Sequence, residues 1–170
     1  MTEILQIEPI GVIETPFEEA EGAPIQSSRS AGATGTIRLD PRFREGLDDL
    51  EGFERIWLIY WFHKAPEPRL KVTPFLDQEE RGIFATRAPA RPCPIGMSAV
   101  RLLAIHGSIL EVADVDMLNG TPLLDIKPYV PEFDCHPQSR AGWLDRSRSE
   151  RSLADGRFSP LSPAADSEGT

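Results

Sequence analysis

The stretch from Thr86 to Gly96 is the part of the sequence best suited to hold a ligand. It reads Thr-Arg-Ala-Pro-Ala-Arg-Pro-Cys-Pro-Ile-Gly, with three prolines in six residues and arginines at positions 87 and 91. Proline restricts the backbone, so this loop loses little conformational entropy when it becomes ordered. A stiff loop carrying two cations can hold an anionic group in a fixed place. The alternative is a surface connection that is stiffened for stability alone.

Carboxylates form a second group of candidates. Asp114 and Asp116 lie in an alternating segment, residues 112–118, and residues two apart share one face of a strand. They can accept hydrogen bonds from ribose hydroxyls or an ammonium group, and a solvated strand face is the alternative. Asp125 and Lys127 also share a face, and here the alternative is a cross-turn ion pair of small energetic value.

Several familiar catalytic arrangements are disfavoured. His63 ends an aromatic segment, where it can contact a ligand or be purely structural. The two cysteines are 42 residues apart and lack the close spacing of zinc ligands, so no metal site is expected. Ser98 and His106 have no G-x-S-x-G context, and neither a dinucleotide-binding nor a P-loop motif occurs.

Short strands must position these residues. The 170 residues include 16 prolines and 13 glycines, a composition that disfavours long helices. The most hydrophobic segment, Phe53 to His63, is rich in β-branched and aromatic residues and predicts a buried strand. Further strands are predicted at Ile4–Ile13, Thr36–Leu39, Gly82–Thr86, Met97–Ala104 and Ser108–Val115.

Turns and loops complete the predicted fold. Asn119-Gly120 predicts a hairpin between the segments 112–118 and 122–129, and Phe43 to Leu50 predicts one or two helical turns. We expect an all-β fold, a small antiparallel β-barrel with short helical turns and long loops, over residues 1–144. Residues 145–170 are polar without apolar periodicity, so a disordered tail is expected there.

The charge is unevenly distributed. The net charge is −9, which disfavours a protein that holds nucleic acid by bulk charge. Residues 1–54 contribute −8 of it, from 12 acidic and 4 basic residues. Residues 82–110 contain no acid but hold Arg87, Arg91 and Arg101. This positive island is suited to an anionic substrate, unless its arginines pair with acids of the N-terminal third.

Nothing in the sequence predicts export or a membrane partner. No apolar run approaches the roughly 20 residues that span a bilayer. The N-terminus has acids where a signal peptide has positive charge. With only two cysteines, a reduced cytoplasmic location is expected.

From about Ile10 to Phe133 the sequence resembles the TsaA-like family, which includes the TrmO-type tRNA methyltransferases. The matching segments are Ile10–Phe17, the aromatic strand ending in Phe62-His63, Gly82–Arg87, Arg91–Ser98 and Asn119–Pro131. The last two are long and peculiar enough to make chance similarity very improbable. The resemblance implies a small antiparallel β-barrel that forms homodimers, binds S-adenosyl-L-methionine near the dimer interface, and methylates N6 of threonylcarbamoyl-adenosine 37 in tRNA.

The resemblance also implies which residues form the site. The cofactor contacts it implies are Ser27, Ser28, Arg29, His63, Lys64, Arg87, Met97, Ala113, Asp114, Val115 and Asp116. Arg91, Lys127 and Tyr129 are implied for substrate placement, and Asp125 is the candidate base. Physically, Arg87 suits the carboxylate of the cofactor, and Asp114 or Asp116 suits its ribose or ammonium group.

Some residues depart from the family pattern. Glu14 stands where TrmO members tend to have arginine, Asn119 replaces an aspartate, and Cys93 replaces an asparagine. The additional C-terminal domain of longer bacterial members is also absent from this sequence. With the net charge, these departures weaken the expectation of a tRNA substrate more than that of cofactor binding. A non-catalytic binder of the cofactor, a methyltransferase with another acceptor, and an interaction domain with a vestigial site are therefore alternatives.

Overall fold

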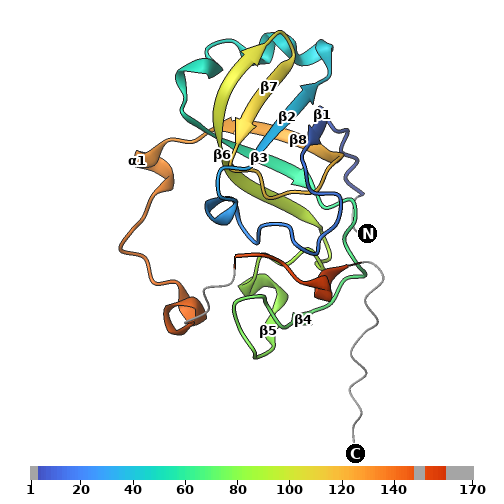
Figure 1. The fold of residues 1–170 in the computed structure, drawn as a ribbon, viewed down its shortest axis with the longest axis vertical. Helices are drawn as coiled ribbons and strands as arrows, with labels where there is room; N and C mark the ends of the chain where they lie inside the picture. The colour runs from blue at the N-terminus through green and yellow to red at the C-terminus, as the bar shows by residue number, and fades with distance from the viewer. Residues whose placement is uncertain (1–3, 148–151, 160–170) are drawn as a thin grey trace, which may run out of the picture.

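Six antiparallel strands close into a barrel in the order β1-β2-β7-β6-β3-β8 (Figure 1). The structure, a computed structural model, describes residues 4–147 and 152–159. The all-β barrel predicted from the sequence is confirmed. The barrel strands are β1 (Gly11–Glu14), β2 (Thr34–Leu39), β3 (Arg55–Trp61), β6 (Ile95–His106), β7 (Ile109–Ala113) and β8 (Thr121–Pro128).

The core of the barrel follows from strand alternation. In β3, Ile56, Leu58 and Tyr60 point inward, and the residues between them face outward. The other strands contribute fully buried aliphatic residues, including Ile13, Ile37, Val100, Leu110, Val112 and Leu123. Each such side chain contributes about 1.5–3 kcal/mol by leaving water, so this core is the main source of the barrel's stability.

A second, smaller unit packs beside the barrel, and we call residues 69–91 the small lobe. It contains the two-stranded sheet of β4 (Lys71–Val72) and β5 (Arg81–Gly82), followed by the 3-10 helix η4 (Ile83–Ala85). Its own apolar cluster consists of Val72, Ile83, Ala88, Ala90 and Phe158, with Phe75 packed against it. The small lobe thus depends on a residue from the C-terminal end of the described chain.

The C-terminal region therefore differs from the prediction. Residues 152–159 pack against the protein, Phe158 is only 4% exposed, and two short helices form, η5 (Gly142–Arg146) and η6 (Gly156–Phe158). The expectation of disorder from residue 145 onward is wrong for these residues. Leu153 and Phe158 are too widely spaced to give an apolar period. Residues 148–151 and 160–170 of the predicted tail lie outside the described residues.

Two local predictions are also corrected. Asn119-Gly120 does not close a hairpin, since β7 pairs with β2 and β6 whereas β8 pairs with β1 and β3. The turn instead contacts the end of β1, where the Asn119 side chain accepts a hydrogen bond from the Thr15 N–H. The predicted strand from Gly82 to Thr86 is mostly the helix η4.

The remaining helices are all short. The predicted turns near Phe43 are present as η2 (Pro41–Leu47) and η3 (Leu50–Gly52). The long loop before β2 contains η1 (Ser27–Arg29), and α1 (Pro131–Asp134) follows β8. Within the described ranges, no helix has the length and apolar character needed to cross a membrane.

Candidate functional site

A hydrogen-bonded row of three side chains forms the centre of the candidate site, and we call it the polar chain. The Ser98 Oγ–H donates to Asp116 Oδ1 at 2.6 Å, and the Tyr60 and Ser98 hydroxyl oxygens are 3.0 Å apart. A serine hydroxyl has one hydrogen, so the Tyr60 O–H must donate to Ser98. The polar chain therefore directs both hydroxyl donors towards one carboxylate.

Strand pairing and a glycine create the space for this chain. Ser98 and Gly96 alternate inward along β6, and Gly96 lies opposite Tyr60 of β3. A Cβ at Gly96 would lie 2.3 Å from the Tyr60 ring. The ring also makes an edge contact with Phe62, with centroids 5.4 Å apart. Glycine at position 96 thus lets Tyr60 lie across β6 and reach Ser98.

Asp116 occupies an unusual electrostatic position. Burial raises the pKa of its carboxyl to about 6, although hydrogen bonds from Ser98 and from the Ser27 backbone N–H, and the charge of Arg87, oppose the shift. Burial and the nearby Asp116 charge raise the pKa of Tyr60, so its phenol stays neutral. The carboxylate is therefore ionised at pH 7 in an environment that disfavours its charge.

Asp114 has a different role from Asp116. The strand β7 ends at Ala113, and Asp114 then takes a left-handed φ of 69°. Its carboxylate pairs with Arg55 at 2.9 Å and with Arg101 at 3.1 Å. The prediction that the two aspartates share a face is wrong, because the left-handed residue breaks the alternation.

The neighbours of these aspartates are structural. Ala113 and Val115 are buried, and the Val115 N–H donates to the Ala33 carbonyl oxygen. Val115 belongs to the apolar core of the barrel and the Ala113 side chain is a single buried methyl group, so any polar contact they make with a ligand would come from the backbone.

The loop residues Ser27, Ser28 and Arg29 form η1, which packs against β6. Ser28 is exposed, whereas Ser27 and Arg29 are partly buried. The next residue, Ser30, is buried, and among the described residues its hydroxyl has no hydrogen-bond partner. This loop thus brings the Ser27 N–H to Asp116 and leaves a buried hydroxyl unsatisfied nearby in the sequence.

His63 and Lys64 lie just beyond the end of β3. The His63 Nδ1 is 3.4 Å from the Thr121 hydroxyl, and the Lys64 ammonium donates to the Glu18 carbonyl oxygen at 2.8 Å. Partial burial, and then the charge of Lys64, lower the pKa of His63, so the imidazole is neutral at pH 7. These residues connect the end of β3 to the start of β8 and to the loop before η1.

The other predicted residues lie on the outside of the barrel, on a surface that we call the outer face. Met97 lies opposite Ile59, which is also opposite Asp125, and Lys127 lies opposite Trp57. The Asp125 carboxylate pairs with Lys127 at 2.8 Å. The Tyr129 and Trp57 rings are 5.5 Å apart. The residues of the outer face are Trp57, Ile59, Trp61, Met97, Asp125, Lys127 and Tyr129.

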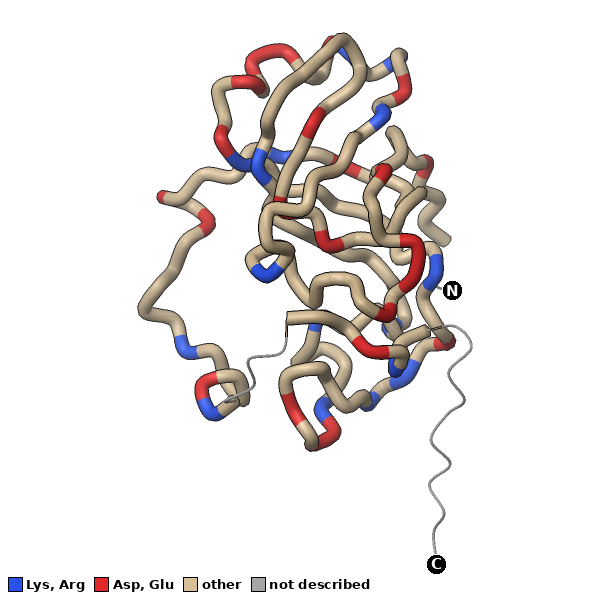
Figure 2. The backbone as a smooth tube through the Cα atoms, in the orientation of Figure 1, with Lys and Arg blue, Asp and Glu red and all other residues tan. Residues whose placement is uncertain are grey.

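The three arginines of the positive island, Arg87, Arg91 and Arg101, have different environments. Arg101 is paired, but with Asp114 rather than with an acid of the N-terminal third as the alternative interpretation predicts. The Arg91 guanidinium donates to the Thr86 carbonyl oxygen at 3.2 Å, so it braces its own loop. Arg87 is exposed and close enough to influence the pKa of Asp116. Figure 2 shows acidic and basic positions interspersed over the barrel and the small lobe.

Two members of the polar chain were not predicted as site residues. Ser98 lies within a segment that carries the family resemblance, and Tyr60 lies in the aromatic strand. Alternation places each of them inside the barrel, and that inward position in otherwise apolar strands is the signal that could have identified them. Within the described residues, no group of three or more metal-ligating side chains comes together.

The family model for the tRNA-methyltransferase O N-terminal domain matches residues 12–135. The chain belongs to this family. A Pyrococcus abyssi relative named as a probable S-adenosyl-L-methionine-binding protein is 52% identical over 155 residues, covering 90% of this chain and 84% of the relative. The human tRNA (adenine(37)-N6)-methyltransferase is 34% identical over 137 residues, covering 76% of this chain and 31% of the human protein.

Solved structures of the TrmO family share the fold. A crystal structure of TrmO from P. aeruginosa superimposes with a TM-score of 0.72 and 38% sequence identity. The match covers 85% of this chain and 63% of the TrmO chain. This chain therefore spans less than two thirds of that TrmO protein and under a third of the human relative.

Proposed function

We propose that this member of the TrmO family is an S-adenosyl-L-methionine-dependent methyltransferase that methylates N6 of threonylcarbamoyl-adenosine 37 in tRNA. The observation that carries the proposal is the partly buried Asp116 carboxylate, held by Ser98 and the Ser27 N–H and faced by Arg87. The names of the P. abyssi and human relatives support the cofactor and the reaction.

The donor set fits this cofactor. S-adenosyl-L-methionine carries a sulfonium cation, an ammonium, a carboxylate and ribose hydroxyls. Asp116 supplies an acceptor with a negative charge, and Arg87 supplies a cation for the carboxylate. The buried Ser30 hydroxyl, which lacks a partner among the described residues, adds a polar group close to Ser27. When bound, the cofactor supplies a methyl group on a positively charged sulfur, which is a good leaving group.

The residues of the chain act mainly by positioning. Asp116 accepts a hydrogen bond from an N–H or O–H of the cofactor, and the Tyr60–Ser98 pair fixes the orientation of its carboxylate. Methyl transfer requires an in-line approach of the acceptor nitrogen, and holding that geometry can supply several kcal/mol of the barrier reduction. The amine proton released by the reaction needs an acceptor. Asp125 is our candidate, and Arg91, Lys127 and Tyr129 are candidates for placing the RNA.

The experiment is methyl transfer from labelled S-adenosyl-L-methionine to tRNA. Threonylcarbamoylated tRNA should gain label at adenosine 37, and the same tRNA without the threonylcarbamoyl group should gain little. Asp116→Asn should abolish most of the transfer, and Asp114→Asn should retain it. Absence of label with the wild-type protein, when calorimetry shows that the cofactor binds, would reject the methylation of this tRNA.

A non-catalytic binder of the cofactor is the second candidate. The P. abyssi relative is named only for binding S-adenosyl-L-methionine, and this chain covers 84% of it. The net charge of −9 also disfavours RNA binding by bulk charge. The same experiment separates the two, since a binder shows calorimetric heat but transfers no label to any RNA pool.

We also propose that the protein forms a homodimer through the outer face. Trp61 is 38% exposed and Met97 is 48% exposed, and both lie on this surface of the barrel beside Ile59. Apolar side chains gathered on one surface are typical of protein interfaces. Sedimentation should give twice the mass of one chain, and Met97→Glu should shift the protein towards monomer.

A further inference from the structure

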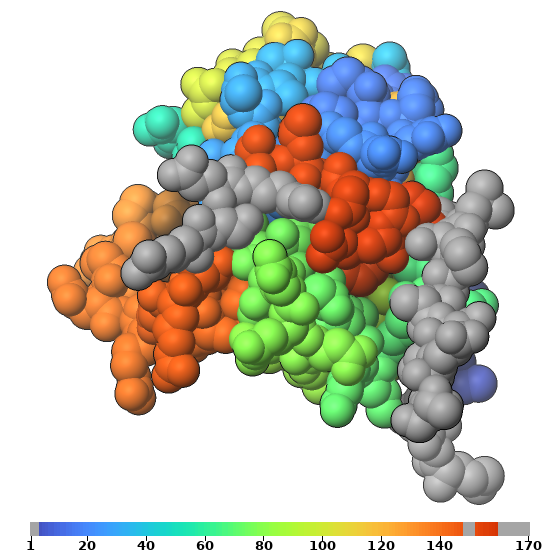
Figure 3. All heavy atoms as spheres, turned by 60° about the horizontal axis from the view of Figure 1, so that its bottom comes forward, coloured from blue at the N-terminus to red at the C-terminus, as the bar shows by residue number. Residues whose placement is uncertain are grey.

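The segment Ser152–Phe158 crosses two loops that supply the candidate cofactor site. Figure 3 shows it, in red, lying between the loop that leads to η1 and the small lobe. The segment contacts this loop and the small lobe through backbone hydrogen bonds, an aromatic ring contact and hydrogen bonds from a guanidinium.

The first contact holds the loop before η1. Leu153 forms an isolated antiparallel bridge with Pro24. The Ile25 N–H donates to the Ser152 carbonyl oxygen at 2.9 Å. The Gly22 N–H donates to the Ala154 carbonyl oxygen at 2.9 Å, and the Ala154 N–H donates to the Ala23 carbonyl oxygen at 2.8 Å. Two residues after Ile25 the chain reaches Ser27, whose N–H bonds to Asp116. This pairing therefore fixes the approach of the chain to the cofactor loop.

The second contact holds the loop that carries Arg87. Phe158 is 4% exposed and packs in the same apolar cluster as Ala88 and Ala90, on either side of Pro89. Its ring meets Phe75 edge-on, with centroids 5.1 Å apart. Because Ala88 directly follows Arg87, burial of Phe158 limits where that arginine can lie.

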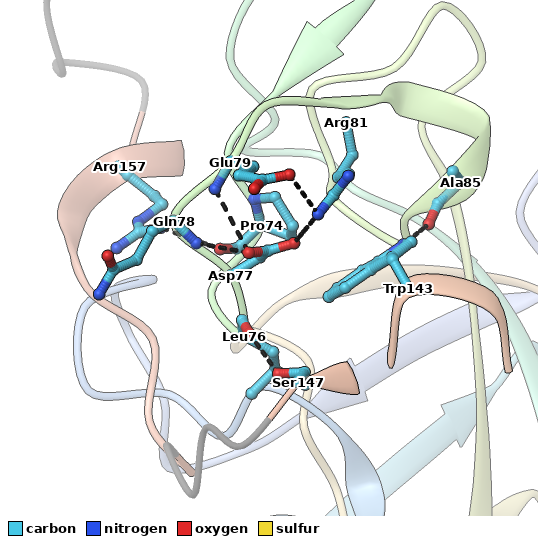
Figure 4. A network of polar contacts seen from close by, with 10 residues as sticks. All are labelled: Pro74, Leu76, Asp77, Gln78, Glu79, Arg81, Ala85, Trp143, Ser147 and Arg157. Atoms are coloured by element: carbon cyan, nitrogen blue, oxygen red, sulfur yellow. Dashed lines mark hydrogen bonds and ion pairs between the residues drawn. The ribbon is translucent and has the colours of Figure 1, made fainter. Parts of the chain in front are cut away.

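Polar contacts also join the C-terminal region to the small lobe. The Arg157 guanidinium donates to the carbonyl oxygens of Thr73 and Pro74 at 3.3 and 3.1 Å, and Asp155 pairs with it at 2.7 Å. Just upstream, the Trp143 indole N–H donates to the Ala85 carbonyl oxygen at 2.8 Å (Figure 4).

Figure 4 also shows the network on which Trp143 rests. Arg81 lies over the Trp143 ring at 5.8 Å and pairs with Asp77 at 2.7 Å. Ser147 donates to the Leu76 carbonyl oxygen. The C-terminal region thus contacts the small lobe at several points of its chain.

We propose that Ser152–Phe158 is a strap that positions the Ser27 loop and the Arg87 loop against each other, with Phe158 as its principal positioning residue. The inference rests on the proposed cofactor site. Neither loop belongs to a barrel strand, and the contact of η1 with β6 holds only the Ser27 loop, so the barrel alone does not fix the two loops relative to each other. A site built from two loops binds tightly only when both are already in place, because ordering them on binding lowers affinity.

The test uses the full chain with Phe158→Ala, the conservative Phe158→Leu, and Phe43→Ala as a matched control. Phe43 lies in η2, outside both loops, and is 37% exposed. If strap loss leaves both loops in place about a tenth of the time, the dissociation constant rises about tenfold. Calorimetry with S-adenosyl-L-methionine should show this rise for Phe158→Ala, substantial recovery for Phe158→Leu, and no change for Phe43→Ala.

Amide hydrogen exchange provides a second readout that does not depend on the cofactor. In Phe158→Ala, exchange should accelerate in residues 20–30 and 83–91 and stay unchanged in β3 and β6. Unchanged exchange in both loops would overturn the strap, as would equal acceleration throughout the barrel. If the wild-type protein does not bind the cofactor, the proposed function fails. The exchange result then still decides whether the strap holds the loops.

Discussion

The polar chain and the outer face lie on opposite sides of the same strands and have opposite characters. In β6, Ser98 points into the barrel and Met97 points out of it. Asp116 is partly buried beside hydroxyl donors and has a raised pKa, whereas the Asp125 side chain is 44% exposed and paired with an exposed lysine. The comparison shows that neighbouring residues of one segment that carries the family resemblance, Arg91–Ser98, can face two different surfaces. We assign the cofactor to the polar chain, and the partner subunit or the body of the tRNA to the outer face.

The largest effect is expected from the charge of Asp116. Its folded pKa of about 6 exceeds the ordinary 3.8, so the folded protein binds the proton more tightly than the unfolded chain does. Stability from this group is therefore full below about pH 4 and is lost as the pH rises to about 6. The loss amounts to about 3 kcal/mol, taking about 1.4 kcal/mol for each unit of pKa.

Urea unfolding of the wild type and of Asp116→Asn over this pH range measures that loss. The other acids contribute equally to the pH dependence of both proteins, so their contributions cancel when the two free energies of unfolding are subtracted. Asp116→Asn should therefore gain stability relative to the wild type as the pH rises. A difference that stays constant from pH 4 to 7 would show that Asp116 is not held in a charge-disfavouring position.

Among the variants that leave the net charge unchanged, Gly96→Ala should disrupt the polar chain most. The new methyl group would meet the Tyr60 ring at 2.3 Å, so the ring must move away from Ser98. We expect a loss of about 1–3 kcal/mol in the free energy of unfolding, together with weaker cofactor binding. Gly82→Ala is the control, because no atom lies within 4 Å of its added methyl group. Equal stability of the two variants would contradict the packing that we describe.

Tyr60→Phe removes one hydroxyl and keeps the ring. Ser98 can still donate to Asp116, so the carboxylate retains its nearest partner. The free energy of unfolding should fall by about 1 kcal/mol, as is typical of one buried hydrogen bond. Thermal unfolding measures this effect, and Ser98→Ala, which removes both bonds, should cost more than Tyr60→Phe. The reverse order would mean that Tyr60 has another, more important partner.

Changes on the outer face should have the smallest effect on stability. Lys127→Ala removes an exposed ion pair with Asp125, which contributes no more than about 1 kcal/mol. Cofactor affinity should stay unchanged, while methyl transfer to tRNA should fall if the outer face holds the body of the tRNA. A matching loss of cofactor affinity would remove the separation between the two surfaces.

The sequence predicts the barrel well because alternation and β-branched residues act locally. The strands 97–104 and 108–115 are recovered as β6 and β7, since their apolar pattern follows the barrel interior. Pairing between distant strands does not follow from local pattern, so Asn119-Gly120 predicts a hairpin that does not form. Tyr60 and Ser98 are 38 residues apart, and only the pairing of β3 with β6 brings them together. The left-handed Asp114 likewise could not be predicted, because it depends on where β7 ends.

The most direct test of the central claim is the dissociation constant for S-adenosyl-L-methionine in Asp116→Asn and Asp114→Asn at pH 7.5, measured by calorimetry. Both variants remove one negative charge, and the two positions are two residues apart. Loss of a charge-assisted hydrogen bond should weaken binding roughly tenfold to a hundredfold in Asp116→Asn. Asp114→Asn should bind like the wild type, because its carboxylate is occupied by Arg55 and Arg101. Equal affinities for the two variants, or a greater loss in Asp114→Asn, would contradict a cofactor site centred on Asp116.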